Sequence, residues 1–317
     1  MEKDRAVLEV LYGDVAIKTF SLGDRSKEIE NGKLTKGDVL EVEFSPEAVP
    51  YEHIMTVDRF YPNDGDCYDG ILFQFHSQNY KPEADCNGCS VIDLEKREVI
   101  QFIELGFNQN FHNSSITFAK QRYSRKDRFP LLYASENYAP NDYYKVIVYR
   151  VIETGDPKSP FALDIVQTIN MPDPHKNGTL YPHCFYDHEG DCLWIEAYSS
   201  DKKENVYTRY ALPKFRKNTV VDMGEPLETF RLPRDPKTDQ AIFKRGNRMY
   251  QVVGYHKCGK LRVIDLETKT LYKNVDLTSL GLEHEPEAVY FHNGDMYITF
   301  FQEGKTAIYK ILPEVYE

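Results

Sequence analysis

The stretch at residues 283–300, Glu-His-Glu-Pro-Glu-Ala-Val-Tyr-Phe-His-Asn-Gly-Asp-Met-Tyr-Ile-Thr-Phe, predicts a β-hairpin. Asn293 and Gly294 separate two segments rich in aromatic and β-branched residues. Asn-Gly favours a two-residue hairpin turn, because both central residues of that turn must adopt positive φ. A third strand is expected at 306–312, after Gly304. The phrase is therefore expected to be one unit of a repeating all-β fold.

Variants of this unit recur along the chain. Val-Ile-Asp-Leu-Glu occurs at 91–95 and again at 263–267, each time followed by a turn and a second β-rich segment. The turn Asp-His-Glu-Gly-Asp at 187–191 matches Phe-His-Asn-Gly-Asp at 291–295. Recurring units of this kind are typical of β-propellers, in which each repeat is a four-stranded blade of about 40–50 residues.

The spacing of the innermost strands predicts five blades. The intervals between their expected starts are 43, 71, 57 and 47 residues, and the two longer intervals contain insertions. The expected starts are Asp69, His112, His183, Gln240 and Glu287. In the first blade we expect 70–76 to be innermost. Six blades remain an alternative if the N-terminal segment contributes to a further blade.

The chain is expected to comprise a β-rich leader at 1–47, with strands at 6–12 and 15–20, and a propeller domain at 48–317. The last blade has only three strands before the sequence given ends. An unpaired blade edge is prone to aggregation. We therefore expect 52–61 to supply the fourth strand by pairing with 306–312, which closes the propeller.

Composition excludes several classes of protein. The net charge is −11 and the basic residues are scattered, so no nucleic-acid partner is expected. The loop at 120–128, with Arg122, Arg125, Lys126 and Arg128, is interpreted as solvated rather than as a polyanion site. No apolar run is long enough to span a membrane. Glycine-rich phosphate loops, G-x-S-x-G and H-E-x-x-H are absent.

Neither the first residues of the sequence nor its six cysteines form a recognised targeting, disulfide or metal motif. The first residues precede no apolar segment, so the sequence predicts a cytoplasmic protein, or an exported one if a signal segment has been removed. The six cysteines are too sparse for a disulfide framework. Cys86 and Cys89 have the spacing of half a zinc site, but flanking a turn is the favoured interpretation. Nothing in the sequence indicates an oligomeric state.

Candidate site residues lie where the inner strands are expected to begin, since these loops converge on the mouth of the central channel. A carbohydrate site is the favoured hypothesis. Glycoside hydrolysis requires a protonated carboxyl and a second carboxylate. The candidate catalytic residues are Asp69, Glu285 and Glu287, and the candidate ligand-binding residues are Tyr68, His112, Asn113, Tyr181, His183, Asp239 and Gln240. Alternatively, these carboxylates cap turns or accept backbone amides.

Two further hypotheses stay open. No cofactor is expected, but a channel metal could use His112 and His183 with Asp69 or Glu287, and calcium could use carboxylates with Asn113. A non-catalytic scaffold would hold a glycan or protein partner through the aromatic segments 138–144 and 123–129.

Three segments of the sequence resemble those of a known family: 285–297, His112-Asn113-Ser114, and Phe-Pro-Leu-Leu-Tyr-Ala-Ser at 129–135. These phrases resemble the five-bladed propeller of staphylococcal phage receptor-binding proteins and of TagC-like teichoic-acid-associated proteins. The resemblance covers about residues 50–317. It implies a bacterial or phage origin and glycan binding, and it transfers no catalytic residue. Glutaminyl-cyclotransferase-type propellers and five-bladed arabinan hydrolases share the blade count, but their active-site phrases are absent.

Overall fold

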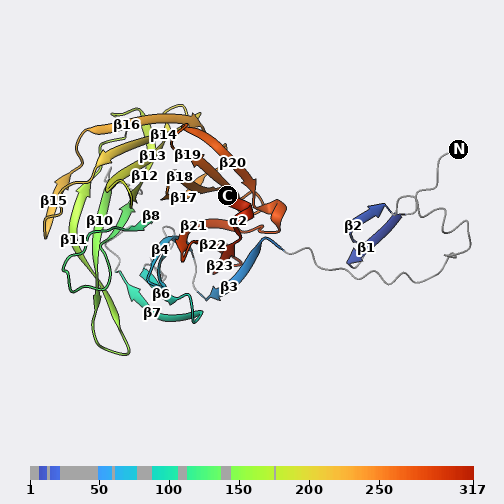
Figure 1. Cartoon of the computed structure of the whole chain (residues 1–317), viewed down its shortest axis with the longest axis horizontal. Coiled ribbons are helices and arrows are strands. Elements are labelled where there is room, and N and C mark those ends of the chain that lie inside the picture. Colours follow the sequence, from blue (N-terminus) through green and yellow to red (C-terminus); the bar gives the residue numbers. More distant parts are fainter. Residues whose placement is uncertain are drawn as a thin grey trace, which may run out of the picture. The chain divides into compact units, whose positions relative to one another are not determined.

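Five sheets, four of them entirely antiparallel, surround a common axis in the computed structural model and form a five-bladed β-propeller (Figure 1). The structure describes residues 7–12, 15–21, 49–58, 61–76, 88–105, 113–136, 144–174 and 176–317. The chain divides into two compact units, 1–48 and 49–317. In the first unit, β1 (Val7–Tyr12) pairs with β2 (Val15–Ser21), which confirms the hairpin expected there. The second unit is the propeller.

The first two blades differ in strand number. Blade 1 contains β4 (Pro62–Tyr68), β5 (Ile71–His76), β6 (Gly88–Asp93) and β7 (Glu98–Glu104). Blade 2 contains β8 (Asn113–Phe118), β9 (Leu132–Glu136), β10 (Lys145–Glu153), β11 (Phe161–Asn170) and, outermost, β15 (Thr219–Asp222).

The remaining blades have four strands each. Blade 3 contains β12 (Thr179–Asp187), β13 (Cys192–Ser199), β14 (Glu204–Ala211) and β16 (Pro226–Pro233). Blade 4 contains β17 (Asp239–Arg245), β18 (Arg248–Val253), β19 (Lys260–Asp265) and β20 (Thr270–Asp276). Blade 5 contains β21 (Glu285–His292), β22 (Asp295–Gln302), β23 (Lys305–Ile311) and β3 (Tyr51–Val57).

The propeller closes as predicted. Strand β3 pairs antiparallel with β23, from Tyr51 opposite Ile311 to Val57 opposite Thr306. Contacts between consecutive inner strands, and from β21 back to β4, complete the circle. Joining an N-terminal strand to the last blade leaves that blade with no missing strand, so five blades is the count.

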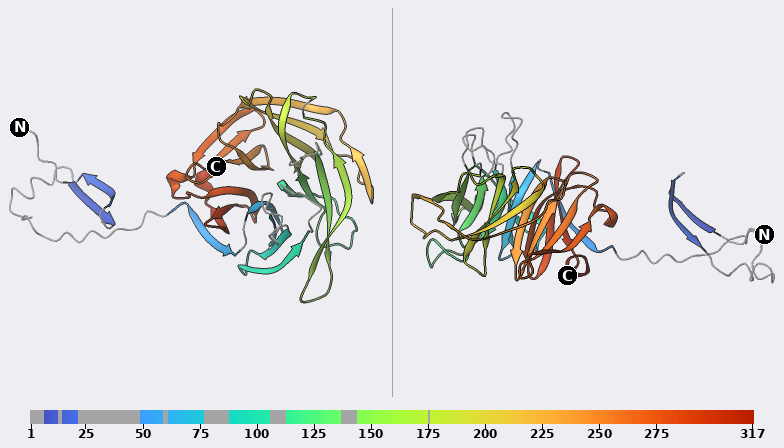
Figure 2. Two further views of the ribbon diagram at one scale, coloured as in Figure 1. Left: turned by 180° about the vertical axis from the view of Figure 1, so that it is seen from behind. Right: turned by 90° about the horizontal axis from the view of Figure 1, so that it is seen from above.

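Blade 2 carries an unexpected fifth strand. After β14 the chain leaves blade 3, runs beside β11 as the parallel strand β15, and then returns to blade 3 as β16. The two views in Figure 2 follow this segment along the outer edge of the propeller. The segment 212–225 therefore links the outer edges of two neighbouring blades.

The prediction for the inner strand of blade 1 was wrong. The segment 70–76 forms β5, the second strand, and β4 is innermost. The sequence of β4, Pro-Asn-Asp-Gly-Asp-Cys-Tyr, resembles a turn in composition. It is held as a strand because Asp64 and Asp66 accept backbone amides of β8, and because Gly65 lies against the β5 backbone. A Cβ at Gly65 would lie 2.8 Å from the carbonyl oxygen of Phe73.

The internal repeat is confirmed in three dimensions. Val-Ile-Asp-Leu-Glu ends the third strand of blade 1 and of blade 4, β6 and β19. In both turns an aspartate, Asp93 or Asp265, accepts two backbone amides, and the residue four positions later has positive φ. Asn293 and Gly294 also have positive φ, as the opening hairpin requires.

The hydrophobic core lies between the blades, where aromatic and aliphatic side chains of adjacent sheets pack together. Helical structure in the described residues is limited to α2 (Pro313–Tyr316) and the 3₁₀ turn η2 (Thr278–Leu280). None of the helices in these ranges has the length and apolar composition needed to cross a membrane. The C-terminal helix packs where the inner strands end, with Tyr316 against Phe291.

Candidate ligand site at the inner strands

Every inner strand is interrupted by a β-bulge near its beginning. The pairing with the second strand of the blade shifts between Pro62 and Gly65, Asn113 and Ser115, Leu180 and His183, Asp239 and Ala241, and Pro286 and Ala288. Because a bulge displaces a residue from the ladder, it re-aims that side chain. Five displaced segments at the same end of the propeller define what we call the bulge ring: Asn63-Asp64, Ser114, Tyr181-Pro182, Gln240 and Glu287.

Glu287 lies in an acidic environment within the bulge ring. Burial raises the pKa of Glu287 well above its ordinary value, and the negative charges of Glu285 and Asp64 raise this pKa further. Within the described part of the chain, no hydrogen-bond partner is found for the Glu287 carboxyl, which retains partial exposure. The group therefore tends to keep its proton, and it can still bond to a ligand.

Glu285 is positioned by the neighbouring blade. The Gln240 side-chain amide donates to Glu285 Oε1 at 2.8 Å and to the Gly254 carbonyl at 3.0 Å. Burial raises the pKa of Glu285, and the hydrogen bond from Gln240 opposes this rise. The structure thus brings Gln240, Glu285 and Glu287 together at the boundary between blades 4 and 5.

Asp64 completes the acidic group but is largely engaged by the backbone. Its carboxylate accepts the amides of Ile116 at 2.7 Å and of Gly65 at 2.8 Å. Asp66, two residues later, accepts the amide of Phe118 at 2.7 Å. Burial raises the pKa of Asp64 well above its ordinary value and raises that of Asp66 to about 7, despite these amides. Both aspartates tie blade 1 to the backbone of β8 in blade 2.

Asp239 belongs to a buried polar network between blades 3 and 4. Asn205 donates to Glu196 and, at 2.7 Å, to Asp239, while the Asp239 amide donates to the Tyr198 hydroxyl at 2.9 Å. Burial raises the pKa of Glu196 well above its ordinary value, as does the nearby charge of Asp239. Burial raises the pKa of Asp239 to about 6. Arg262 lies in the same network, 2.8 Å from Gln251. Asp239 therefore joins blades rather than facing a ligand.

The remaining predicted ligand-binding residues differ in position. Tyr181 is a bulge residue with positive φ and a 53% exposed side chain, so it is available at the mouth. His183 directly follows this bulge and is buried. Asn113 begins β8, and His112 lies outside the described residues.

Asp69 and Tyr68 lie at the wrong end of blade 1 for this site. Asp69 is in the turn after β4, so its expected position at the start of an inner strand was wrong. A seven-residue strand separates this turn from the bulge ring by roughly 20 Å. Arg128 forms an ion pair with Asp69 at 2.8 Å, and Arg122 donates to the Tyr68 hydroxyl at 2.6 Å. Neither residue can share a ligand with Glu287.

Metal ligands do not gather in the described residues: no group of three or more His, Cys, Asp or Glu side chains is placed to hold an ion there. The channel-metal hypothesis grouped His112 and His183 with Asp69 or Glu287; Asp69 is far from His183 and Glu287, and His112 lies outside the described residues. Cys89 is buried, and burial raises the pKa of its thiol well above the ordinary value. This environment favours a neutral thiol, whereas a zinc ligand is a thiolate. Cys86 lies outside the described residues.

Sequence reasoning missed Asn63, Asp64 and Ser114 in the bulge ring, and Glu196 and Asn205 in the buried network. Asp64 and Asp66 were hidden in a segment that resembles a turn. Their alternation along that segment, with both carboxylates on one face, was the available signal. Glu196 and Asn205 lie in ordinary strand sequences and carried no signal.

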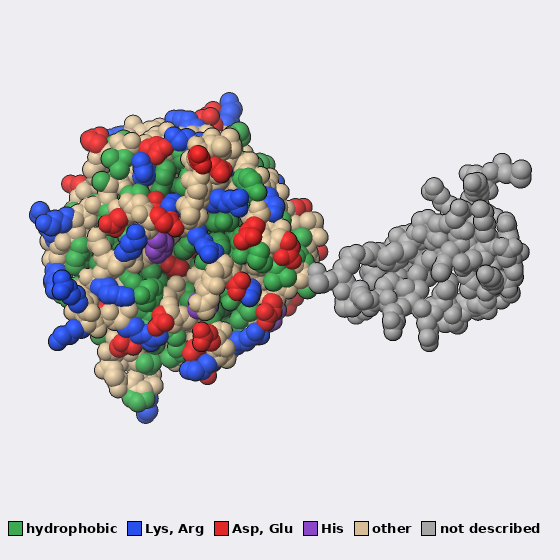
Figure 3. All heavy atoms as spheres, in the orientation of Figure 1, with side chains coloured by type: hydrophobic (Ala, Val, Ile, Leu, Met, Phe, Trp, Pro, Cys, Tyr) green, Lys and Arg blue, Asp and Glu red, His purple; other side chains and the backbone are tan. Residues whose placement is uncertain are grey.

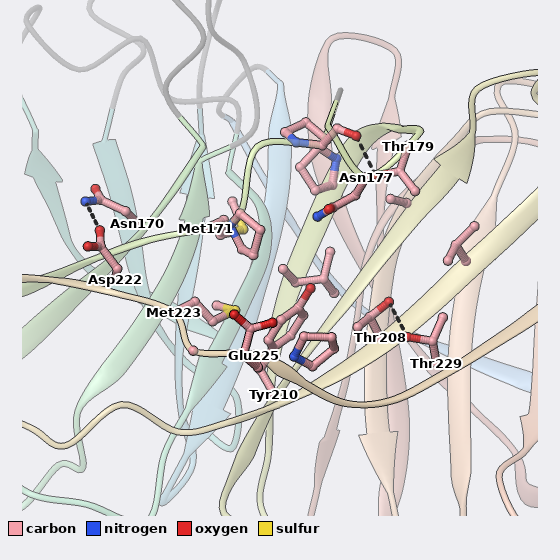
Figure 4. Close-up of a pocket in the computed structure, with 18 of the residues that line it drawn as sticks. Asn170, Met171, Asn177, Thr179, Thr208, Tyr210, Asp222, Met223, Glu225 and Thr229 are labelled. Carbon is pink, nitrogen blue, oxygen red and sulfur yellow. Dashed lines mark hydrogen bonds between the residues drawn. The ribbon is translucent and has the colours of Figure 1, made fainter.

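A separate cavity of about 600 Å³ lies between blades 2 and 3 (Figure 4). Its lining includes Met171, Met223 and Tyr210, and the segment around Glu225 borders it. Polar groups on its wall are partly paired, as in the hydrogen bond from Asn170 to Asp222 at 2.8 Å. The cavity contains none of the site residues predicted from sequence, and it shares only Pro182 with the bulge ring.

Comparison with known proteins finds distant similarity to solved structures only. No family model matches the chain, and no curated protein matches it. Similar solved structures include Myxococcus xanthus glutaminyl cyclase, with a TM-score of 0.49 and 11% identity over 83% of this chain and 97% of that one. A glucose dehydrogenase has a TM-score of 0.49 and 7% identity, over 82% of this chain and 98% of that one. A β-1,3-galactosidase has a TM-score of 0.44 and 9% identity, over 80% of this chain and 94% of that one.

These likenesses are too distant to carry an argument about activity. The five-bladed architecture is shown by the strand pairing itself. The finer resemblance to phage receptor-binding and TagC-like propellers stays a prediction.

Proposed function

We propose that the bulge ring binds a carbohydrate at the mouth of the central channel, with Glu287 as the principal polar contact. The observation that carries this proposal is the state of Glu287: a carboxyl with raised pKa, displaced from the β-ladder, and without a hydrogen-bond partner among the described residues. Sugar hydroxyls can donate to and accept from a protonated carboxyl. Asp64, Glu285 and Asp239 each already accept at least one hydrogen bond.

The neighbouring residues would orient the sugar. Gln240 holds Glu285 at 2.8 Å, so the Glu285 carboxylate has a fixed direction. Tyr181, exposed at its own bulge, offers an aromatic face on which the apolar side of a sugar ring could stack. In a hydrolytic version of the site, Glu287 would act as the general acid and Glu285 as the second carboxylate.

The test is a glycan-array screen with a parallel hydrolysis assay, comparing wild type with Glu287→Gln. Glutamine matches the shape and hydrogen bonding of a protonated glutamate but cannot transfer a proton. A hydrolase should therefore retain binding and lose turnover by at least about 100-fold in Glu287→Gln. Glycan binding with no turnover in either protein would exclude hydrolysis, and no glycan binding by wild type would exclude the proposal.

The alternative is a non-catalytic interaction scaffold, and the engagement of Asp64 favours it. Asp64 accepts two backbone amides, and Asp66 and Asp239 also take part in contacts between blades. Three buried carboxyls thus have structural roles. If Glu287 proves insensitive to substitution in every binding assay, this interpretation of the region is the better one.

A further inference from the structure

Two basic segments that are distant in sequence meet on one edge of the propeller. Residues 120–128 and 214–217 contain eight basic residues and one acidic residue, Asp127, although the chain carries a net charge of −11. We call this surface the basic edge; its cations are Lys120, Arg122, Arg125, Lys126, Arg128, Lys214, Arg216 and Lys217. In Figure 3, blue side chains gather along the edge at which Figure 1 places β11 and β15.

Aromatic contacts join the two segments. The rings of Tyr123 and Phe215 are 6.1 Å apart, and Lys217 Nζ lies 3.9 Å from the centre of the Tyr123 ring. Arg150 of β10 lies over the same ring at 4.5 Å. The segment 214–217 belongs to the connection that crosses from blade 3 to blade 2, so this unusual crossing is what brings the second set of cations to the first.

The loop that carries the first set is held in one conformation. Arg150 donates two hydrogen bonds to Asp127, at 2.9 and 2.8 Å, and Arg122 donates to the Arg128 carbonyl at 2.9 Å. The Leu131 amide bonds to the Gln121 carbonyl at 2.7 Å. A pre-organised surface loses less conformational entropy on binding than a mobile loop does. The sequence indicated a simple solvated loop at 120–128, whereas in the structure hydrogen bonds hold this loop in one conformation.

Positive charge at the basic edge is not neutralised by its surroundings. Asp127 is bound by Arg150, and Asp69 and Glu153 are bound by Arg128. For the other seven cations, Lys120, Arg122, Arg125, Lys126, Lys214, Arg216 and Lys217, no carboxylate lies within ion-pair distance in the described part of the chain. All seven are exposed.

The chemistry of the basic edge selects among polyanions. Neither segment exposes a large hydrophobic side chain, and the adjoining strands expose only Ile165 and Val220. A membrane surface or a protein partner would be expected to use a larger hydrophobic contact. The Tyr123 ring is already covered by cations, so it offers no free face for stacking an unpaired nucleobase. The net charge of −11 opposes the approach of duplex nucleic acid. The basic edge therefore offers mainly exposed lysine and arginine cations, which suit a polymer that carries an anionic group on successive units.

We propose that the basic edge binds an acidic polysaccharide. Both segments follow strands that end at the face opposite the bulge ring, β8 and β14. This surface is therefore separate from the proposed Glu287 site, and either proposal can fail without the other.

The test measures binding to immobilised dextran sulfate and polygalacturonate by biolayer interferometry at several salt concentrations. The variant reverses Arg125, Lys126, Lys214 and Arg216 to Glu. Its matched control reverses Lys158, Lys176, Lys257 and Lys305, which are exposed outside the two basic segments, so both variants have the same net charge. Duplex DNA and phosphatidylglycerol vesicles serve as competing polyanions, and Glu287→Gln is included to separate the two sites.

Wild type and the control variant should bind at least one of the two polysaccharides, with an affinity that falls as salt rises. The basic-edge variant should bind at least about tenfold more weakly and with a smaller salt dependence. Glu287→Gln should bind as wild type. Equal losses in the two reversal variants, tighter binding to DNA or vesicles than to either polysaccharide, or no polysaccharide binding by folded wild type would overturn the proposal.

Discussion

Gln240 and Glu285 are joined across the boundary between blades 4 and 5, with Gln240 Nε2 donating to Glu285 Oε1 at 2.8 Å. Gln240 is the residue displaced by the bulge in β17, and Glu285 begins β21. The bulge of one blade therefore sets the orientation of a carboxylate in the next. Without the bulge, Gln240 would remain in register with β18.

Replacing Gln240 by Ala should raise the pKa of Glu285 further, because the hydrogen bond from Gln240 opposes the effect of burial. Carbon-13 NMR titration of the side-chain carboxyl measures this change. Gln302→Ala is the control, since Gln302 accepts a hydrogen bond from the Tyr309 hydroxyl and, among the described residues, forms none with Glu285. An unchanged Glu285 titration in Gln240→Ala would show that the hydrogen bond does not form in solution.

Asp66 should make the fold less stable as pH rises. Burial raises its pKa in the folded state to about 7, so between about pH 4 and 7 the folded protein holds a proton that the unfolded chain has lost. The stabilisation from that proton is complete below about pH 4 and is lost as pH rises through about 7. Asp66→Asn keeps an acceptor for the Phe118 amide and removes the titration.

The free energy of unfolding should therefore fall less steeply between pH 4 and 7 in Asp66→Asn than in wild type, by on the order of 4 kcal/mol across this range. Urea denaturation at several pH values measures the difference. Asp58→Asn, at a side chain that is 90% exposed, should leave the profile unchanged. Parallel profiles for wild type and Asp66→Asn would contradict the assignment.

Gly65→Ala should destabilise the propeller by about 1–3 kcal/mol, the cost of crowding a packed site. The added Cβ would lie 2.8 Å from the Phe73 carbonyl oxygen, and the backbone must move to accept it. Gly224 has no atom within 4 Å of an added Cβ, so Gly224→Ala is the matched control. Thermal unfolding compares the two. Equal melting temperatures would mean that β4 does not pack against β5 this closely.

Ile54→Ala should lower the free energy of unfolding by about 3 kcal/mol, because Ile54 is buried in the core where β3 closes the propeller. Glu52→Ala, in the same strand, removes only an exposed ion pair with Arg97 and should cost less than about 1 kcal/mol. Chemical denaturation distinguishes them. Near-equal effects would show that β3 is not docked in solution.

Much of the fold was predictable, because blade strands are marked by local patterns. The Asn293-Gly294 turn, the two Val-Ile-Asp-Leu-Glu turns and the incomplete last blade were sufficient to predict five blades and closure by β3. Strand β4 was not predictable from propensity, since its extended form depends on tertiary bonds from Asp64 and Asp66 to β8. For the same reason Asp69 was assigned to the wrong end of blade 1.

The candidate site was predictable in part. Gln240, Tyr181 and Glu287 were identified because polar residues precede inner strands, and they are bulge residues in the structure. Of the neighbouring residues, only Asp64 carried a signal, its alternation with Asp66. Which carboxyls accept backbone amides could not be predicted, because that depends on contacts between blades. The crossing segment that brings 214–217 to 120–128 left no periodic signal, so the basic edge was not foreseen as one surface.

The central claim concerns Glu287, and the most direct measurement is calorimetric titration of the tightest glycan from the array into four proteins: wild type, Glu287→Gln, Glu287→Ala and the control Glu283→Ala. Glu283 is exposed and lies just outside β21. We predict near wild-type affinity for Glu287→Gln and Glu283→Ala, and an affinity at least about tenfold lower for Glu287→Ala, which loses both hydrogen-bonding atoms. Wild-type affinity in Glu287→Ala would contradict a binding role for the bulge ring.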